Sequence, residues 1–110
     1  MGVVNNEAMA GAYAAIAQRA WTTNRTRAAE LDQLVQGWRS TGALSSPERG
    51  RLRELAHTLH GSAGTFGHGE VAAAAAALEG LLTGDPHPEL EAVSQVVARI
   101  SHGLADPPSI

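Results

Sequence analysis

The spacing of apolar residues along the chain predicts a series of helices joined by short polar loops. Leu31, Leu34, Val35 and Trp38 recur at intervals of three and four residues, which places them on one face of an α-helix. Similar spacing predicts helices at five places: about Glu7 to Arg19, Arg25 to Arg39, Pro47 to Phe66, Gly69 to Thr83 and Leu90 to Leu104.

Residues that favour helix ends lie between these segments. Ser46 is followed by Pro47 and Glu48, the order expected of an N-cap, a first-turn proline and an early acidic residue. Asn24 or a neighbouring threonine is the candidate cap of the second helix. A glycine- and proline-rich segment at 84–88 predicts the turn before the last helix.

Four amphipathic helices of similar length bury their apolar stripes best in an antiparallel up-and-down four-helix bundle. We therefore predict an all-α fold in a single domain over 1–110. The bundle is expected to occupy 25–104. The residues 1–22 are expected to form an additional short N-terminal helix or extension across one end, and 105–110 a tail or linker.

The composition narrows the classes of function. The 110 residues include no cysteine, so a disulfide framework and a thiolate metal site are excluded. The net charge is −3 and the basic residues are scattered, which argues against a nucleic acid partner. No stretch reaches the length of about 18 apolar residues that spans a membrane, so we expect a cytoplasmic protein. Charged outer helix faces favour a monomer.

His57 is the candidate for chemistry because helical geometry places it on an exposed surface. At about 100° per residue, the apolar stripe of its helix is centred roughly 140° away from it. Arg53, His60, Gly61 and Gly64 project within about 60° of His57. Each interior glycine costs about 1 kcal/mol relative to alanine, so two on one exposed face indicate that another molecule approaches there.

The segment Ala56-His57-Thr58-Leu59-His60-Gly61-Ser62-Ala63 resembles the phosphoacceptor signature of histidine phosphotransfer domains. The similarity continues through Gly64-Thr65-Phe66-Gly67 to Leu78-Glu79, and is greatest to the phosphoacceptor domain of chemotaxis-type histidine kinases. The helix pattern over 25–104 also fits the bundle of that family. About three quarters of the chain takes part in the resemblance.

The resemblance implies a phosphoryl carrier of a two-component phosphorelay. It makes His57 the phosphorylated residue, and Glu79 the acid that hydrogen-bonds the imidazole and orients it. Gly61, Gly64 and Ser62 would form the surface on which a partner docks. The partners would be a receiver domain of a response regulator, a histidine kinase, or both. The chain has no nucleotide-binding loop, so we expect neither kinase activity nor a cofactor of its own, and Mg²⁺ would come from the partner.

One position departs from the family pattern. The family usually has a lysine three residues after the histidine, where this chain has His60. A protonated imidazole can still attract phosphoryl oxygens, and Arg53 one turn earlier is a second candidate for that charge.

Two other functions remain open from the sequence. Without the lysine, the domain could bind a receiver as a scaffold that is never phosphorylated. Alternatively, His57 and His60 could bind a metal ion, with Glu79 or His68 as a third ligand. His68, His87 and His102 are otherwise interpreted as solvated or capping residues.

Overall fold

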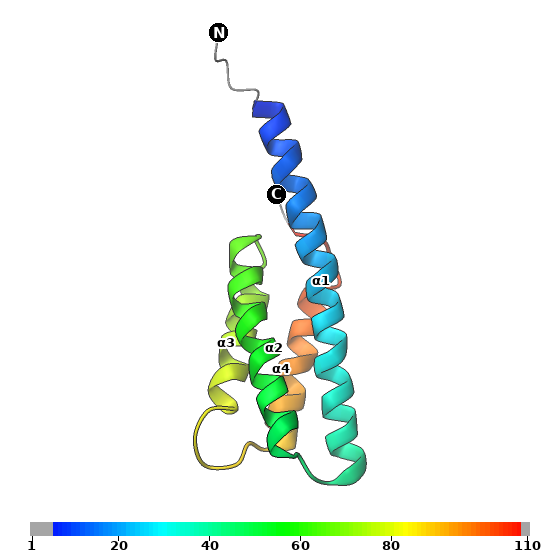
Figure 1. Ribbon diagram of the computed structural model, residues 1–110, viewed down its shortest axis with the longest axis vertical. Helices are drawn as coiled ribbons and strands as arrows, with labels where there is room; N and C mark the ends of the chain where they lie inside the picture. The colour runs from blue at the N-terminus through cyan, green and yellow to red at the C-terminus, as the bar shows by residue number, and fades with distance from the viewer. Residues whose placement is uncertain (1–5, 109–110) are drawn as a thin grey trace.

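The computed structural model describes residues 6–108, and in that range it is an all-helical bundle without strands. Its helices are α1 (Asn6–Thr41), α2 (Ser46–Thr65), α3 (Gly69–Leu81) and α4 (Leu90–Gly103). Successive helices run in opposite directions (Figure 1). The predicted all-α class is confirmed, and the arrangement of the helices is consistent with the predicted up-and-down bundle.

The four helices form a ring in which each packs against two neighbours. α1 and α3 each contact both α2 and α4. The core between them is aliphatic, and its largest fully buried side chains are Leu31, Leu52, Leu59, Leu78, Leu82, Ile100 and Leu104. Burying such a side chain contributes about 1.5–3 kcal/mol, so these residues hold the bundle together.

The first helix corrects the sequence-based prediction. Residues 7–19 do not form a separate short helix across the end of the bundle, because they are the beginning of the continuous helix α1. The hydroxyls of Thr22 and Thr26, near the expected boundary, donate to the carbonyls of Gln18 and Thr22 inside the helix. Threonine can satisfy its hydroxyl in this way without ending a helix.

Contacts with other helices also carry α1 through the expected boundary. Ala17 is completely buried, and Trp21 Nε1 donates to the carbonyl of Leu104 at 2.8 Å. The amide of Asn24 bonds to Ser62 at 3.0 Å. Because these contacts lie just before and within 20–24, packing favours an unbroken helix there.

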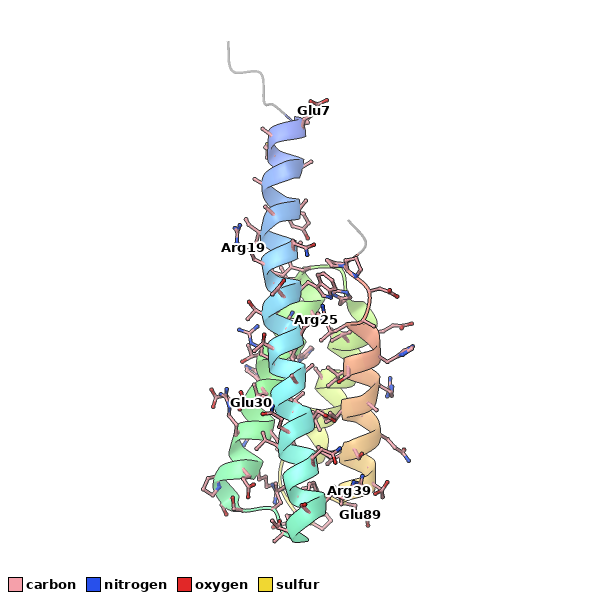
Figure 2. The ribbon with its side chains drawn as sticks, turned by 90° about the vertical axis from the view of Figure 1, so that its right-hand side faces the viewer. Glu7, Arg19, Arg25, Glu30, Arg39 and Glu89 are labelled. Atoms are coloured by element: carbon pink, nitrogen blue, oxygen red, sulfur yellow. The ribbon has the colours of Figure 1, made fainter. Side chains whose placement is uncertain are left out.

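The beginning of α1 extends past the ends of α2 and α3 (Figure 1). Glu7 lies at this projecting end, and Arg39 and Glu89 lie near the opposite end of the molecule (Figure 2). Met9 and Ile16 are exposed on the extension. The hydroxyl of Tyr13 donates to the carbonyl of Thr65 at the end of α2.

The start of α2 carries a complete capping box, one residue earlier than predicted. The N-cap is Ser45 rather than Ser46. The Ser45 hydroxyl accepts from the Glu48 amide at 3.2 Å, and the Glu48 carboxylate accepts from the Ser45 amide at 3.0 Å. These hydrogen bonds with Ser45 lower the pKa of Glu48. The capping box fixes the end of the helix that carries His57.

α3 packs closely against α2 and α4 at glycine positions, and an arginine of α2 binds backbone carbonyls that follow its C-terminal end. A side chain at Gly64 would meet Ala72 at 3.6 Å, and one at Gly103 would meet Val71 at 2.6 Å. The guanidinium of Arg49 donates to the carbonyls of Leu82 and Gly84. α3 is thus held closely between α2 and α4. None of the helices in the described range is long and apolar enough to cross a membrane.

Candidate functional site

His57 projects into solvent from the middle of α2. Its side chain is 77% exposed, whereas Leu55 and Leu59 on the opposite face of the helix are 3% and 0% exposed. The exposure expected from the helical projection is therefore found. Such a ring can be reached by the phosphoryl group of another protein.

The carboxylate of Glu79 on α3 contacts the Nδ1 atom of the His57 imidazole. Its Oε2 is 2.6 Å from His57 Nδ1, and the Glu79 side chain is 27% exposed. An ionised carboxylate only accepts hydrogen bonds, so the proton must be on Nδ1. In the neutral ring, Nε2 then carries the free lone pair. The structure therefore brings together the two residues that the sequence motif pairs.

Arg53 and His57 line the same shallow hollow at the surface of the molecule. Gly50, Glu54 and Glu79 complete its lining. No ion pair involves Arg53 in the range 6–108. Its guanidinium is therefore free to interact with an anion that enters the hollow.

His60 is exposed on the next turn of α2. Within the described part of the chain, no hydrogen bond or ion pair connects it to His57 or Glu79. It shares the helix face of His57, but the structure does not bring it into direct contact with that ring.

The two glycines of the motif differ in their surroundings. A Cβ at Gly61 would meet nothing within 4 Å, so internal packing does not require a glycine there. Gly64 faces Ala72 of α3 at an ordinary contact distance. Because Gly61 and Gly64 have no side chains, nothing projects from these two exposed positions of α2 next to His57.

Ser62 points in another direction from the two glycines. It is half-buried, and its hydroxyl accepts from the buried amide of Asn24 on α1. The sequence grouped Ser62 with the docking residues and did not anticipate this interaction. The Ser62 hydroxyl therefore belongs to the contact between α1 and α2.

The metal-binding alternative gains no support from the geometry. Within residues 6–108, no group of three or more His, Asp or Glu side chains is placed to hold a metal ion. His68 is at the N-cap of α3 without a side-chain cap bond, and its Nε2 lies 3.2 Å from the carbonyl oxygen of Asp106. His87 stacks on Trp38.

Comparison with known families agrees with this geometry. Residues 15–106 match the family model of the Hpt domain, which covers the bundle and begins inside α1. No curated protein and no solved structure matches the chain. Domains of this family transfer phosphoryl groups through a histidine in two-component signalling. The chain belongs to the Hpt domain family.

Proposed function

We propose that this domain is a phosphoryl carrier whose phosphorylated atom is Nε2 of His57. It exchanges the phosphoryl group with an aspartate of a receiver domain or accepts it from a histidine kinase. The observation that supports this most strongly is the contact of 2.6 Å between His57 Nδ1 and Glu79 on an otherwise exposed ring. That contact leaves Nε2 as the accessible nucleophile.

The transfer step needs only the lone pair of Nε2. It attacks the phosphorus of the receiver's aspartyl phosphate, the P–N bond forms, and the bond from phosphorus to the aspartate oxygen breaks. The aspartate leaves with the electron pair as a carboxylate. Nδ1 keeps its proton, so the ring becomes positively charged, and the Glu79 carboxylate at 2.6 Å offsets that charge. The reverse step returns the phosphoryl group.

Charge around the phosphoryl oxygens comes from α2 and from the partner. Arg53 is the fixed cation of the hollow that contains His57. His60 supplies a second charge when its imidazole is protonated. Alignment and charge neutralisation are the main requirements of phosphoryl transfer. Mg²⁺, which would contribute to charge neutralisation, would be supplied by the receiver or kinase.

The docking surface is the exposed face of α2 around Gly61 and Gly64, where a receiver loop can approach the helix closely. The motif from Ala56 to Glu79 resembles that of the phosphoacceptor domain of chemotaxis-type histidine kinases, which supports a receiver domain or a histidine kinase as the partner. We further propose that the domain acts in the cytoplasm, as a monomer and without catalysing phosphorylation from ATP.

The test is incubation with a receiver domain carrying aspartyl phosphate. The protein should acquire phosphate that is labile in acid and stable in base, and His57→Gln should abolish the label. His102→Gln changes another exposed histidine of the bundle and should leave labelling unchanged. Glu79→Gln should slow transfer by roughly 10–100-fold, because the ring loses its charged orienting partner.

Replacement of the family lysine by His60 favours one competing function. In that reading the domain binds a receiver but accepts no phosphate. Receiver binding that is unaffected by His57→Gln, together with no label on the unaltered protein, would establish this scaffold function instead.

A further inference from the structure

A buried amide connects α1 to the helix that carries the candidate site. Asn24 is 1% exposed and is the one buried polar side chain recorded within residues 6–108. Its Nδ2 donates to Ser62 Oγ of α2 at 3.0 Å. Arg27 Nη1 donates to its Oδ1 at 2.7 Å. Arginine only donates hydrogen bonds, so the amide oxygen must face Arg27 and the amide nitrogen must face α2.

An asparagine is an unexpected residue at the buried position 24. Burial of an amide is unfavourable unless its hydrogen bonds are satisfied, and an alanine or leucine would avoid that cost. A hydrogen bond is directional, whereas apolar contact is not. A buried polar pair of this kind fixes the relative position of two helices.

Beyond His57, the contact between α2 and α3 involves small residues, among them Gly64 facing Ala72, and α3 contains an alanine run over 72–77. Small side chains interlock less than large ones and tolerate rotation better. Arg49 and Arg51 also hydrogen-bond from α2 to its neighbours, but they lie in the first half of the helix. The bond from Asn24 is the buried restraint on the half that follows His57.

The hydrogen bond to Ser62 acts on the side of α2 that faces away from His57. At about 100° per residue, Ser62 lies roughly 140° around the helix from His57. A side-chain atom about 5–6 Å from the helix axis moves about 2 Å when the helix rotates by about 20°. Such a movement breaks the contact of 2.6 Å between His57 and Glu79.

We propose that Asn24 is a positioning residue: its hydrogen bond to Ser62 holds the rotation of α2 at which His57 Nδ1 reaches Glu79. Asn24 acts through Ser62 and touches neither the imidazole nor the phosphoryl group. Its effect on transfer rests on the function proposed above, whereas its effect on the histidine contact does not.

The double variant Asn24→Leu/Ser62→Ala tests this directly, because it removes both partners of the hydrogen bond. Arg27 loses its acceptor on Asn24, but it is only partly buried and can bond to water instead. The first readout is the ¹⁵N NMR spectrum of His57 at a pH at which its ring is neutral. The unaltered protein should show the Nδ1–H tautomer, and the double variant a mixture of both tautomers. The second readout is the initial rate of phosphotransfer, which should fall about tenfold.

Single variants separate an effect on the position of His57 from an effect on the stability of the whole domain. Thr26→Leu also places a leucine on α1, but removes a hydroxyl that bonds only within its own helix. It should leave both readouts unchanged. Ser62→Thr keeps the hydroxyl and should retain the Nδ1–H tautomer. Ser62→Ala provides the same comparison if the double variant does not fold.

An unchanged His57 tautomer in a folded variant that lacks the Asn24–Ser62 bond would overturn the positioning role. Two further outcomes distinguish this proposal from the phosphocarrier function. If the tautomer changes as expected but the unaltered protein accepts no phosphate, the positioning role stands and the carrier function fails. If transfer occurs and is equally fast in the variant with an unchanged tautomer, the carrier function stands and the positioning role fails.

Discussion

At the scale of single residues, the proposed phosphorylation of His57 depends on which ring nitrogen carries the proton. Glu79 holds that proton at one end of the ring, and the exposure of the side chain leaves the other end accessible. In the proposed mechanism, the carboxylate also opposes the positive charge that the ring acquires when Nε2 is phosphorylated. A single contact between α2 and α3 would thus both orient the nucleophile and stabilise its product.

His60 stands where the family has a lysine, so the charge at this position can be tested by substitution. A lysine ammonium attracts phosphoryl oxygens, so His60→Lys should speed phosphotransfer to the domain. The initial rate, measured with a phosphorylated receiver, provides the check.

His60→Ala is the control, because it removes the imidazole without adding a charge. If His60→Lys and His60→Ala both accept phosphate as fast as the unaltered protein, position 60 has no electrostatic role in transfer.

Gly61→Ala should affect stability and transfer in opposite directions. The added methyl group meets nothing within 4 Å, and alanine is favoured over glycine in a helix by about 1 kcal/mol. The free energy of unfolding should therefore increase. The methyl group would stand on the proposed docking face, so transfer should become slower. Urea unfolding and phosphotransfer kinetics measure the two effects, and an unchanged transfer rate would remove Gly61 from the docking surface.

At the level of the residues of the site, the sequence predicted the exposure of His57 because its helix has a clear apolar stripe. The pairing with Glu79 came from the family motif, since two residues on different helices cannot be paired by periodicity. The interaction of Asn24 with Ser62 was not predicted. An asparagine next to threonines is typical of a helix cap, and only the packing of α1 on α2 shows that Asn24 lies inside a helix.

At the scale of helices, the boundaries in α2, α3 and α4 followed closely from local signals. The first boundary did not, because polar residues near 22–26 indicated a break. Their hydroxyls bond inside α1, and the contacts of Trp21 with Leu104 and of Asn24 with Ser62 favour an unbroken helix there. The N-cap of α2 was misplaced by one residue because Ser45 and Ser46 are adjacent and equally suited to capping.

The close approach of α3 and α4 predicts opposite effects for two glycine substitutions. Gly103→Ala would place a methyl group 2.6 Å from Val71 Cγ2, and Val71 is a buried, β-branched residue that cannot easily move. We expect a loss of about 1–3 kcal/mol in unfolding free energy. Gly37→Ala is the matched control in α1, because its methyl group meets nothing within 4 Å. It should stabilise the protein by about 0.5–1 kcal/mol.

Thermal or urea unfolding of both variants measures the difference. Equal stability of Gly103→Ala and Gly37→Ala would mean that α3 and α4 are not packed as closely as the structure places them.

At the scale of the whole molecule, the bundle and the projecting end of α1 have different roles. The family match begins at residue 15, and the first buried residue of α1 is Ala17. Tyr13 is the part of the extension that contacts the end of α2. Residues 6–12, which precede it in the described range, are exposed and contribute little to the core that positions His57 and Glu79.

Removal of residues 1–11 should therefore leave the bundle and the site intact. We expect a change in unfolding free energy within about 0.5 kcal/mol and an unchanged rate of phosphotransfer. Urea unfolding and transfer kinetics of the shortened protein provide the check. A large loss of stability would show that the projecting turns of α1 support the bundle, contrary to the burial pattern.

The most direct test of the central claim is to identify the atom that carries the phosphoryl group. After phosphorylation by a receiver, protein labelled with ¹⁵N in its histidines can be studied by NMR for coupling between ¹⁵N and ³¹P. The structure predicts a single coupled nitrogen, Nε2 of His57, with the proton retained on Nδ1. Coupling at Nδ1 of His57, or at a nitrogen of any other histidine, would contradict the assignment of Glu79 as the residue that selects the nucleophile.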